Sequence, residues 1–132
     1  MRGEYPFGKK RNAFGVIAEP IIRIPVLTRY GYQKFDFLVD TGADVSILPV
    51  SVAEDLDISL DDCPEIKLRG IGENAVTAYI GKMTVKILAV PVAITCAFSE
   101  KGILFLLGRK DIFSRFSILF DNARNVVRFN PF

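Results

Sequence analysis

The sequence contains no histidine and no tryptophan, and its only cysteines are Cys63 and Cys96. Without histidine, the chain cannot build a Ser-His-Asp or a Cys-His catalytic centre. A zinc site of the Cys/His type needs four ligands, which two widely separated cysteines do not supply. The carboxylates of Asp and Glu therefore remain as the candidate catalytic groups, and we expect neither a metal nor another cofactor.

Long apolar segments are also missing. The longest largely apolar stretch, Ile87 to Phe98, spans twelve residues and contains Pro91, whereas a membrane-spanning helix needs about 20 residues. The chain opens without an apolar signal segment. We therefore expect a cytoplasmic protein that does not cross a membrane and whose two cysteines stay reduced.

Charge of one sign is not in large excess, because 17 Lys and Arg residues face 15 Asp and Glu residues, for a net charge of +2. Proteins that bind nucleic acid usually gather a clear basic excess on one face. The only basic cluster is Lys9-Lys10-Arg11, which we interpret as part of a solvated N-terminal tail. We expect no nucleic-acid partner.

The chain is long enough for one domain with its own core, since half of its 132 residues are hydrophobic. Short runs rich in β-branched and aromatic residues alternate with Gly, Pro, Asn and Asp, which is typical of an all-β domain. Residues 1–12 are polar and predict a mobile N-terminal arm, followed by one domain over residues 13–132. Strands are predicted at Phe14–Ala18, Ile21–Thr28, Gln33–Val39, Ile66–Arg69, Ala75–Ile80, Met83–Val90, Val92–Phe98, Ile103–Leu107, Ser117–Phe120 and Val126–Phe129.

Two short segments break the strand pattern. Residues 49–56 predict a short helix that Ser51 would cap. Residues 109–113 follow Gly108 and predict one amphipathic helical turn.

The most informative motif is FLVDTGAD at residues 37–44. Here a carboxylate, Asp40, ends a wholly apolar strand and precedes a glycine that permits a tight turn and a close backbone approach. The simplest alternative is an ordinary Asp/Gly turn at the end of a strand. Two further motifs, RGIGE at residues 69–73 and ILFLLGR at residues 103–109, favour a functional role for Asp40.

In this order and spacing, the three motifs resemble those of the retropepsin-like family of aspartic proteases, over roughly residues 14 to 130. The resemblance implies an all-β, closed, barrel-like domain with a flap hairpin and one or two short helices. The chain has one Asp-Thr-Gly motif where the family's catalytic pair needs two aspartates. We therefore expect a C2 homodimer whose site lies on the symmetry axis, with the Val126–Phe129 strands of the two chains paired.

By this resemblance the protein is an aspartic endopeptidase that hydrolyses peptide bonds, between hydrophobic residues, with a water molecule activated by Asp40 from each chain. Thr41 would hydrogen-bond across the dyad, and Gly42 would offer its carbonyl to the substrate backbone. Ala43 stands where many aspartic proteases have serine. The loss of that hydroxyl removes a donor to the ionised carboxylate, which predicts activity reaching toward neutral pH.

The resemblance also implies a substrate-binding set and a structural ion pair. A buried pair between Asp44 and Arg109 would join the active loop to the turn after the second apolar motif, and Asp44 would secondarily touch the substrate. A glycine-rich flap tip would close over the peptide. The full substrate-binding set is Leu38, Gly42, Ala43, Asp44, Ile47, Gly70, Ile71, Leu104 and Leu106.

Two other interpretations stay open on the sequence alone. The leading alternative is a catalytically silent module of the same fold that binds peptides or dimerises, in which case Asp40 would be dispensable. The chain is also compatible with a piece of a viral or transposon polyprotein.

Overall fold

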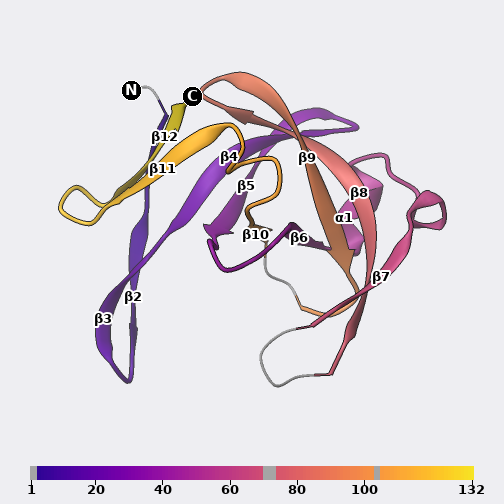
Figure 1. Cartoon of the computed structure of the whole chain (residues 1–132), viewed down its shortest axis with the longest axis horizontal. Coiled ribbons are helices and arrows are strands. Elements are labelled where there is room, and N and C mark those ends of the chain that lie inside the picture. Colours follow the sequence, from indigo (N-terminus) through magenta and orange to yellow (C-terminus); the bar gives the residue numbers. More distant parts are fainter. Residues whose placement is uncertain (1–2, 70–73, 103–104) are drawn as a thin grey trace.

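The computed structural model describes residues 3–69, 74–102 and 105–132 and is almost entirely β-structure (Figure 1). Its elements are β1 (Glu4–Pro6), β2 (Gly8–Asn12), β3 (Gly15–Glu19), β4 (Ile21–Thr28), β5 (Gly31–Val39), β6 (Ser46–Pro49), α1 (Ser51–Asp55), the 3-10 turn η1 (Leu60–Asp62), β7 (Glu65–Leu68), β8 (Val76–Ile87), β9 (Val90–Ser99), β10 (Leu106–Leu107), β11 (Phe116–Asp121) and β12 (Val126–Pro131). The all-β prediction is confirmed.

The main sheet has the strand order β4-β5-β10-β6-β9-β8-β7. A further pairing of Val26 in β4 with Val85 in β8 joins the two sides, so that the strands form a ring. The strands fit this ring because their side chains alternate, as in β4, where Ile22, Ile24 and Val26 point inward and are buried. Burial of each such side chain contributes about 1.5 to 3 kcal/mol to folding.

The expected flap hairpin is present as the antiparallel pair β7–β8, in register from Glu65 opposite Tyr79 to Leu68 opposite Val76. The predicted glycine-rich tip falls on residues 70–73, which lie outside the described residues.

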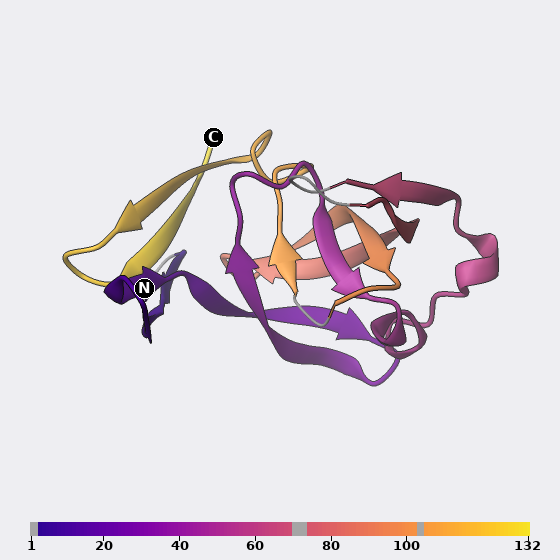
Figure 2. The same ribbon diagram turned by 90° about the horizontal axis from the view of Figure 1, so that it is seen from below.

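A smaller sheet, here called the terminal sheet, joins the two ends of the chain in the order β1-β12-β11. Figure 2 shows it at one end of the molecule, at the side away from α1. Its side chains pack around Phe129, whose ring makes edge-on contacts with Tyr5 and Phe116. Because β12 has β1 on one edge and β11 on the other, the prediction that Val126–Phe129 pairs with its symmetry mate is wrong for this structure.

A double ion pair also fastens β1 to the end of the chain. The Arg124 guanidinium donates two hydrogen bonds of 2.9 Å to the Glu4 carboxylate, and Arg128 donates others of 3.0 and 2.7 Å. These bonds, that of Arg124 first, lower the pKa of Glu4 to about 2.

The N-terminal residues differ from the predicted mobile arm, because residues 4–12 contribute β1 and β2. β2 pairs with β3 in an antiparallel hairpin from Gly8 opposite Glu19 to Asn12 opposite Gly15. The polar composition of this segment gave no hint of strands, since its pairing partners and not its own residues determine its conformation.

Three local predictions are corrected by the backbone. The short helix is present as α1, but its N-cap is Val50 without a side-chain hydrogen bond, so the Ser51 cap is wrong. Residues 109–113 form hydrogen-bonded turns in place of a helical turn, with Asp111 at a φ of 68° and its carboxylate accepting a 2.7 Å hydrogen bond from the Thr95 amide. The strand predicted to reach Val90 stops at Ile87.

No helix in the described part of the chain has the length and apolarity to cross a membrane.

Candidate active site

Asp40 follows the last residue of β5, at the mouth of a loop that its own backbone holds in place. The Asp40 amide donates a 3.0 Å hydrogen bond to the Leu107 carbonyl, and the Asp40 carbonyl accepts one of 3.2 Å from Ala43. Asp40 Oδ1 accepts a 3.0 Å hydrogen bond from the Gly42 amide. The half-buried carboxylate is therefore oriented before any substrate arrives.

Three of the predicted pocket residues lie in one row beside this loop. The two-residue strand β10 runs between β5 and β6 and places Leu106 opposite both Leu38 and Ile47. All three side chains are half-buried, and Leu38 is two residues before Asp40, so alternation places it on the same side of the strand. The structure thus brings an apolar row next to Asp40. Gly70, Ile71 and Leu104, the other predicted contacts, lie outside the described residues.

Backbone hydrogen bonds join the turn after β10 to the loop of residues 40–45, here called the active loop. The contact between this turn and the active loop at Gly108 is here called the Gly108 clasp. The Arg109 and Lys110 amides donate hydrogen bonds of 3.0 and 2.9 Å to the carbonyls of Ala43 and Asp44. At Gly108 the two segments approach so closely that a Cβ would lie 2.5 Å from the Val45 carbonyl carbon and oxygen. Glycine is required at position 108 because there is no space for a Cβ atom.

Sequence reasoning missed one supporting residue, Ser46. Its fully buried hydroxyl accepts a 3.0 Å hydrogen bond from the Gly108 amide and so completes the clasp between the two loops. The available signal was a hydroxyl within an otherwise apolar run, VSILP, because a buried polar side chain needs a hydrogen-bond partner.

Asp44 and Arg109 contact each other, as the resemblance implied, through Oδ1 and a guanidinium nitrogen. The pair is not buried in the single chain, where the side chain of Asp44 is 89% exposed and that of Arg109 is 44% exposed. The predicted burial of this pair is therefore wrong for the single chain. As an exposed ion pair, it contributes at most about 1 kcal/mol to stability. Thr41 is exposed too, and its hydroxyl has no hydrogen bond among the described residues.

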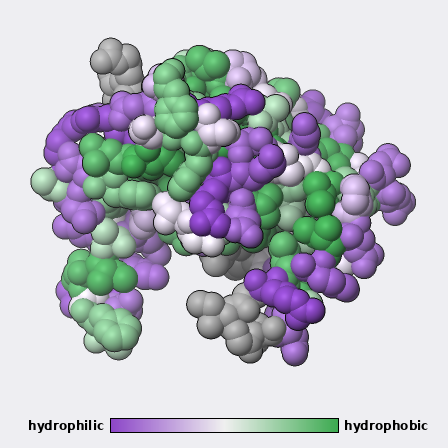
Figure 3. Space-filling view, viewed as in Figure 1, coloured by the Kyte–Doolittle hydropathy of each residue, from purple (hydrophilic) through white to green (hydrophobic). Residues whose placement is uncertain are grey.

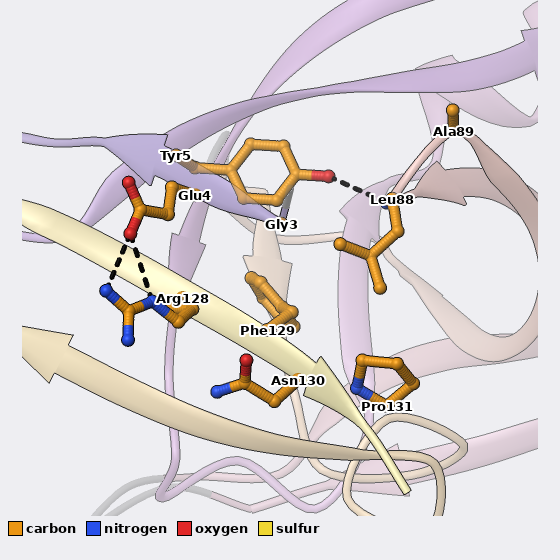
Figure 4. Close-up of a pocket in the computed structure, with 9 residues that line it drawn as sticks. All are labelled: Gly3, Glu4, Tyr5, Leu88, Ala89, Arg128, Phe129, Asn130 and Pro131. Atoms are coloured by element: carbon orange, nitrogen blue, oxygen red, sulfur yellow. Dashed lines mark hydrogen bonds and ion pairs between the residues drawn. The ribbon is translucent and has the colours of Figure 1, made fainter. Parts of the chain in front are cut away.

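The structure also contains a hollow beside the terminal sheet, whose lining does not include Asp40 (Figure 4). Tyr5 reaches across it, and its hydroxyl accepts a 3.3 Å hydrogen bond from the Leu88 amide. The hollow's acidic residue, Glu4, is already bound by two arginines. We therefore do not regard the hollow as a second catalytic site. The hollow is lined by Gly3, Glu4, Tyr5, Leu88, Ala89, Arg128, Phe129, Asn130 and Pro131.

Two solved structures resemble this chain. The crystal structure of a retropepsin-like aspartic protease from Rickettsia conorii matches with a TM-score of 0.62 and 21% identity, over 98% of this chain and 92% of that one. EIAV protease complexed with the inhibitor HBY-793 matches with a TM-score of 0.47 and 22% identity, over 69% of this chain and 82% of that one. The first likeness shows that the fold is retropepsin-like.

The sequence leads to the same class. Residues 26–109 match the family model described as aspartyl protease, a segment that includes both the active loop and the Gly108 clasp. A comparison with curated protein sequences gives no match. The chain belongs to the aspartyl protease family.

Proposed function

We propose that the protein is a homodimeric aspartic endopeptidase in which Asp40 of each of two chains forms the catalytic dyad. The observation that carries this proposal is the position of Asp40, oriented by Gly42 and Leu107 at the end of an apolar row. One chain supplies one such carboxylate, and family membership supports the need for a pair. A twofold axis through the loop would supply the second.

The chemistry follows from two neighbouring carboxylates. Both cannot ionise cheaply, so they share one proton. The ionised member takes a proton from a water molecule between them while the protonated member polarises the scissile carbonyl. The water then attacks to give a tetrahedral gem-diol, which collapses as the leaving amine is protonated. In this proposal Thr41, exposed in the single chain, hydrogen-bonds across the dyad.

The substrate is an extended peptide with apolar side chains beside the scissile bond. Leu38, Ile47 and Leu106 offer it an apolar surface, to which we assign Ile71 and Leu104 as further contacts. The backbone of Gly42 and Gly70 would bind the peptide main chain, in the manner of strand addition. Ala43 in place of serine extends activity toward neutral pH, and an optimum near pH 3 with no activity at pH 6 would contradict that part of the proposal.

The test is cleavage of a complex peptide mixture between pH 4 and pH 7, read by mass spectrometry, with Asp40→Asn as the matched variant. We expect cuts between apolar residues that disappear in Asp40→Asn, since loss of an acid-base group typically costs about 10²- to 10⁴-fold in rate. Sedimentation velocity on both proteins measures whether each is a dimer, as we expect. A dimeric wild type that cuts nothing would refute the enzyme and favour a silent module that binds peptides or dimerises.

A further inference from the structure

The β2–β3 hairpin begins beside the active loop. β3 continues into β4 through Pro20, whose carbonyl accepts a 3.0 Å hydrogen bond from the Val39 amide, the residue before Asp40. Ile21, the next residue, lies opposite Leu38. The β5 strand therefore ends where the hairpin begins, and the hairpin extends past the strand end on the side where the chain turns into the Asp40 loop (Figure 1).

The hairpin stands apart from the ring. β3 has five residues, Gly15–Glu19, which corresponds to a reach of about 16 Å at about 3.3 Å per residue. The space-filling view shows the hairpin as a lobe separated from the body (Figure 3). Every residue of β2 is exposed, and Phe14 at the tip is 89% exposed. Because an isolated two-stranded hairpin is marginally stable in water, this lobe is suited to being completed by a bound segment.

The charge on the hairpin indicates what that segment carries. β2 contains the only basic cluster, Lys9-Lys10-Arg11. Lys10 pairs with Glu19 at 3.6 Å, but Lys9 and Arg11 form no ion pair among the described residues. The register places Lys9 opposite Ala18 and Arg11 opposite Val16. Lys9 and Arg11 are two residues apart in β2, so their side chains lie on one face of the hairpin. That face presents two positive charges with no ion-pair partner among the described residues.

We propose that this face, through Lys9 and Arg11, binds acidic side chains of the substrate at positions remote from the scissile bond. The inference rests on the proposed function, because it assumes a peptide extended through the site beside Asp40. Such a peptide advances about 3.3 Å per residue, so the hairpin's reach corresponds to residues up to about five positions from the scissile bond. Within the part of the chain that the structure describes, the outer edges of β2 and β3 are unpaired, so the peptide backbone has an edge to which it can add.

The test compares two peptides that share an apolar cleavage site and differ only at the fourth and fifth residues on each side, Glu in one and Gln in the other. The proteins are wild type, the double variant Lys9→Gln/Arg11→Gln, and the control Lys34→Gln, which removes an exposed charge on β5. At low salt we expect wild type and the control to cleave the Glu peptide about three to ten times more efficiently, as two exposed ion pairs would give. The double variant should treat both peptides alike, and 0.5 M NaCl should abolish the preference.

The outcomes separate this inference from the proposed function. Equal kcat/KM for both peptides in wild type would overturn the hairpin assignment and leave the protease intact. Binding to Asp40→Asn, measured by fluorescence anisotropy of the labelled peptides, gives the same comparison if no cleavage occurs, and equal affinities there would also overturn the assignment. If the double variant instead dissociates into monomers and loses activity on both peptides equally, the hairpin contacts the second subunit and the inference is wrong.

Discussion

Replacement of Gly108 by alanine tests whether the clasp between the two loops positions the active site. The added Cβ would lie 2.5 Å from the carbonyl carbon and oxygen of Val45 and 2.9 Å from the Ala43 carbonyl oxygen. Carbon atoms normally approach to about 3.5 to 4.0 Å, so the two segments must separate by about 1 Å. That movement would stretch the hydrogen bonds from the Gly108 and Arg109 amides to Ser46 and Ala43, now both 3.0 Å.

The cost follows from these contacts. Overpacking of this kind costs about 1 to 3 kcal/mol, and each weakened hydrogen bond adds about 0.5 to 1.5 kcal/mol. With two such hydrogen bonds, we expect the free energy of unfolding to fall by about 2 to 6 kcal/mol. The rate of peptide cleavage should fall at least tenfold, since a misplacement of about 1 Å at an active site costs up to about 10² in rate.

Urea unfolding followed by circular dichroism measures the stability, and cleavage of an apolar peptide measures the activity. The matched control is Gly8→Ala, where a Cβ would meet no atom within 4 Å, and its stability should change by less than about 0.5 kcal/mol. The reasoning would be refuted if Gly108→Ala were as stable and as active as the control.

Two further predictions concern titratable groups away from the catalytic loop. The pKa of Glu4, lowered from 4.5 to about 2 by its two arginines, means that this carboxylate stabilises the fold fully above pH 4.5 and progressively less as the pH falls toward 2. The urea midpoint of wild type should therefore fall more steeply across that window than the midpoint of Glu4→Gln, and parallel pH profiles would contradict this. Burial, together with the nearby Cys63 thiol, raises the pKa of Cys96 to about 12. At pH 8 a thiol reagent should modify the half-buried Cys63 first and Cys96 only after denaturant is added; equal rates for both thiols in the native protein would count against this.

The parts of the fold that follow from local pattern were predictable. The alternation in β4 and the apolar run before Asp40 identified two central strands, and the spacing of three motifs indicated the retropepsin-like fold. The apolar residues Leu38, Ile47 and Leu106 were placed at the site by resemblance, and the register brings them together. How they act on a substrate stays a prediction.

The rest depended on partners distant in the chain. β1 is a strand because Glu4 to Pro6 lie opposite Val126 to Arg128, a pairing that no local pattern reveals. The turn after β8 places Leu88 and Ala89 at φ values of 59° and 63°. Tight hairpin turns of this kind usually contain glycine or asparagine. The apolar pair Leu88 and Ala89 therefore gave no sequence signal for a turn. The burial of Ser46 likewise depends on the approach of Gly108 from another part of the chain.

The terminal sheet has a consequence for how the protein is made. Its ion pairs join residues 120 and 124 positions apart in the chain, whereas the segments that form the ring are complete once residue 107 has been synthesised. Contacts at such separation form late, because a long loop must close before they stabilise anything. During synthesis the active loop and the ring can therefore fold before β12 is available to pair with β1. The N-terminal strand is then an unpaired edge, open to other chains, until the last strand arrives.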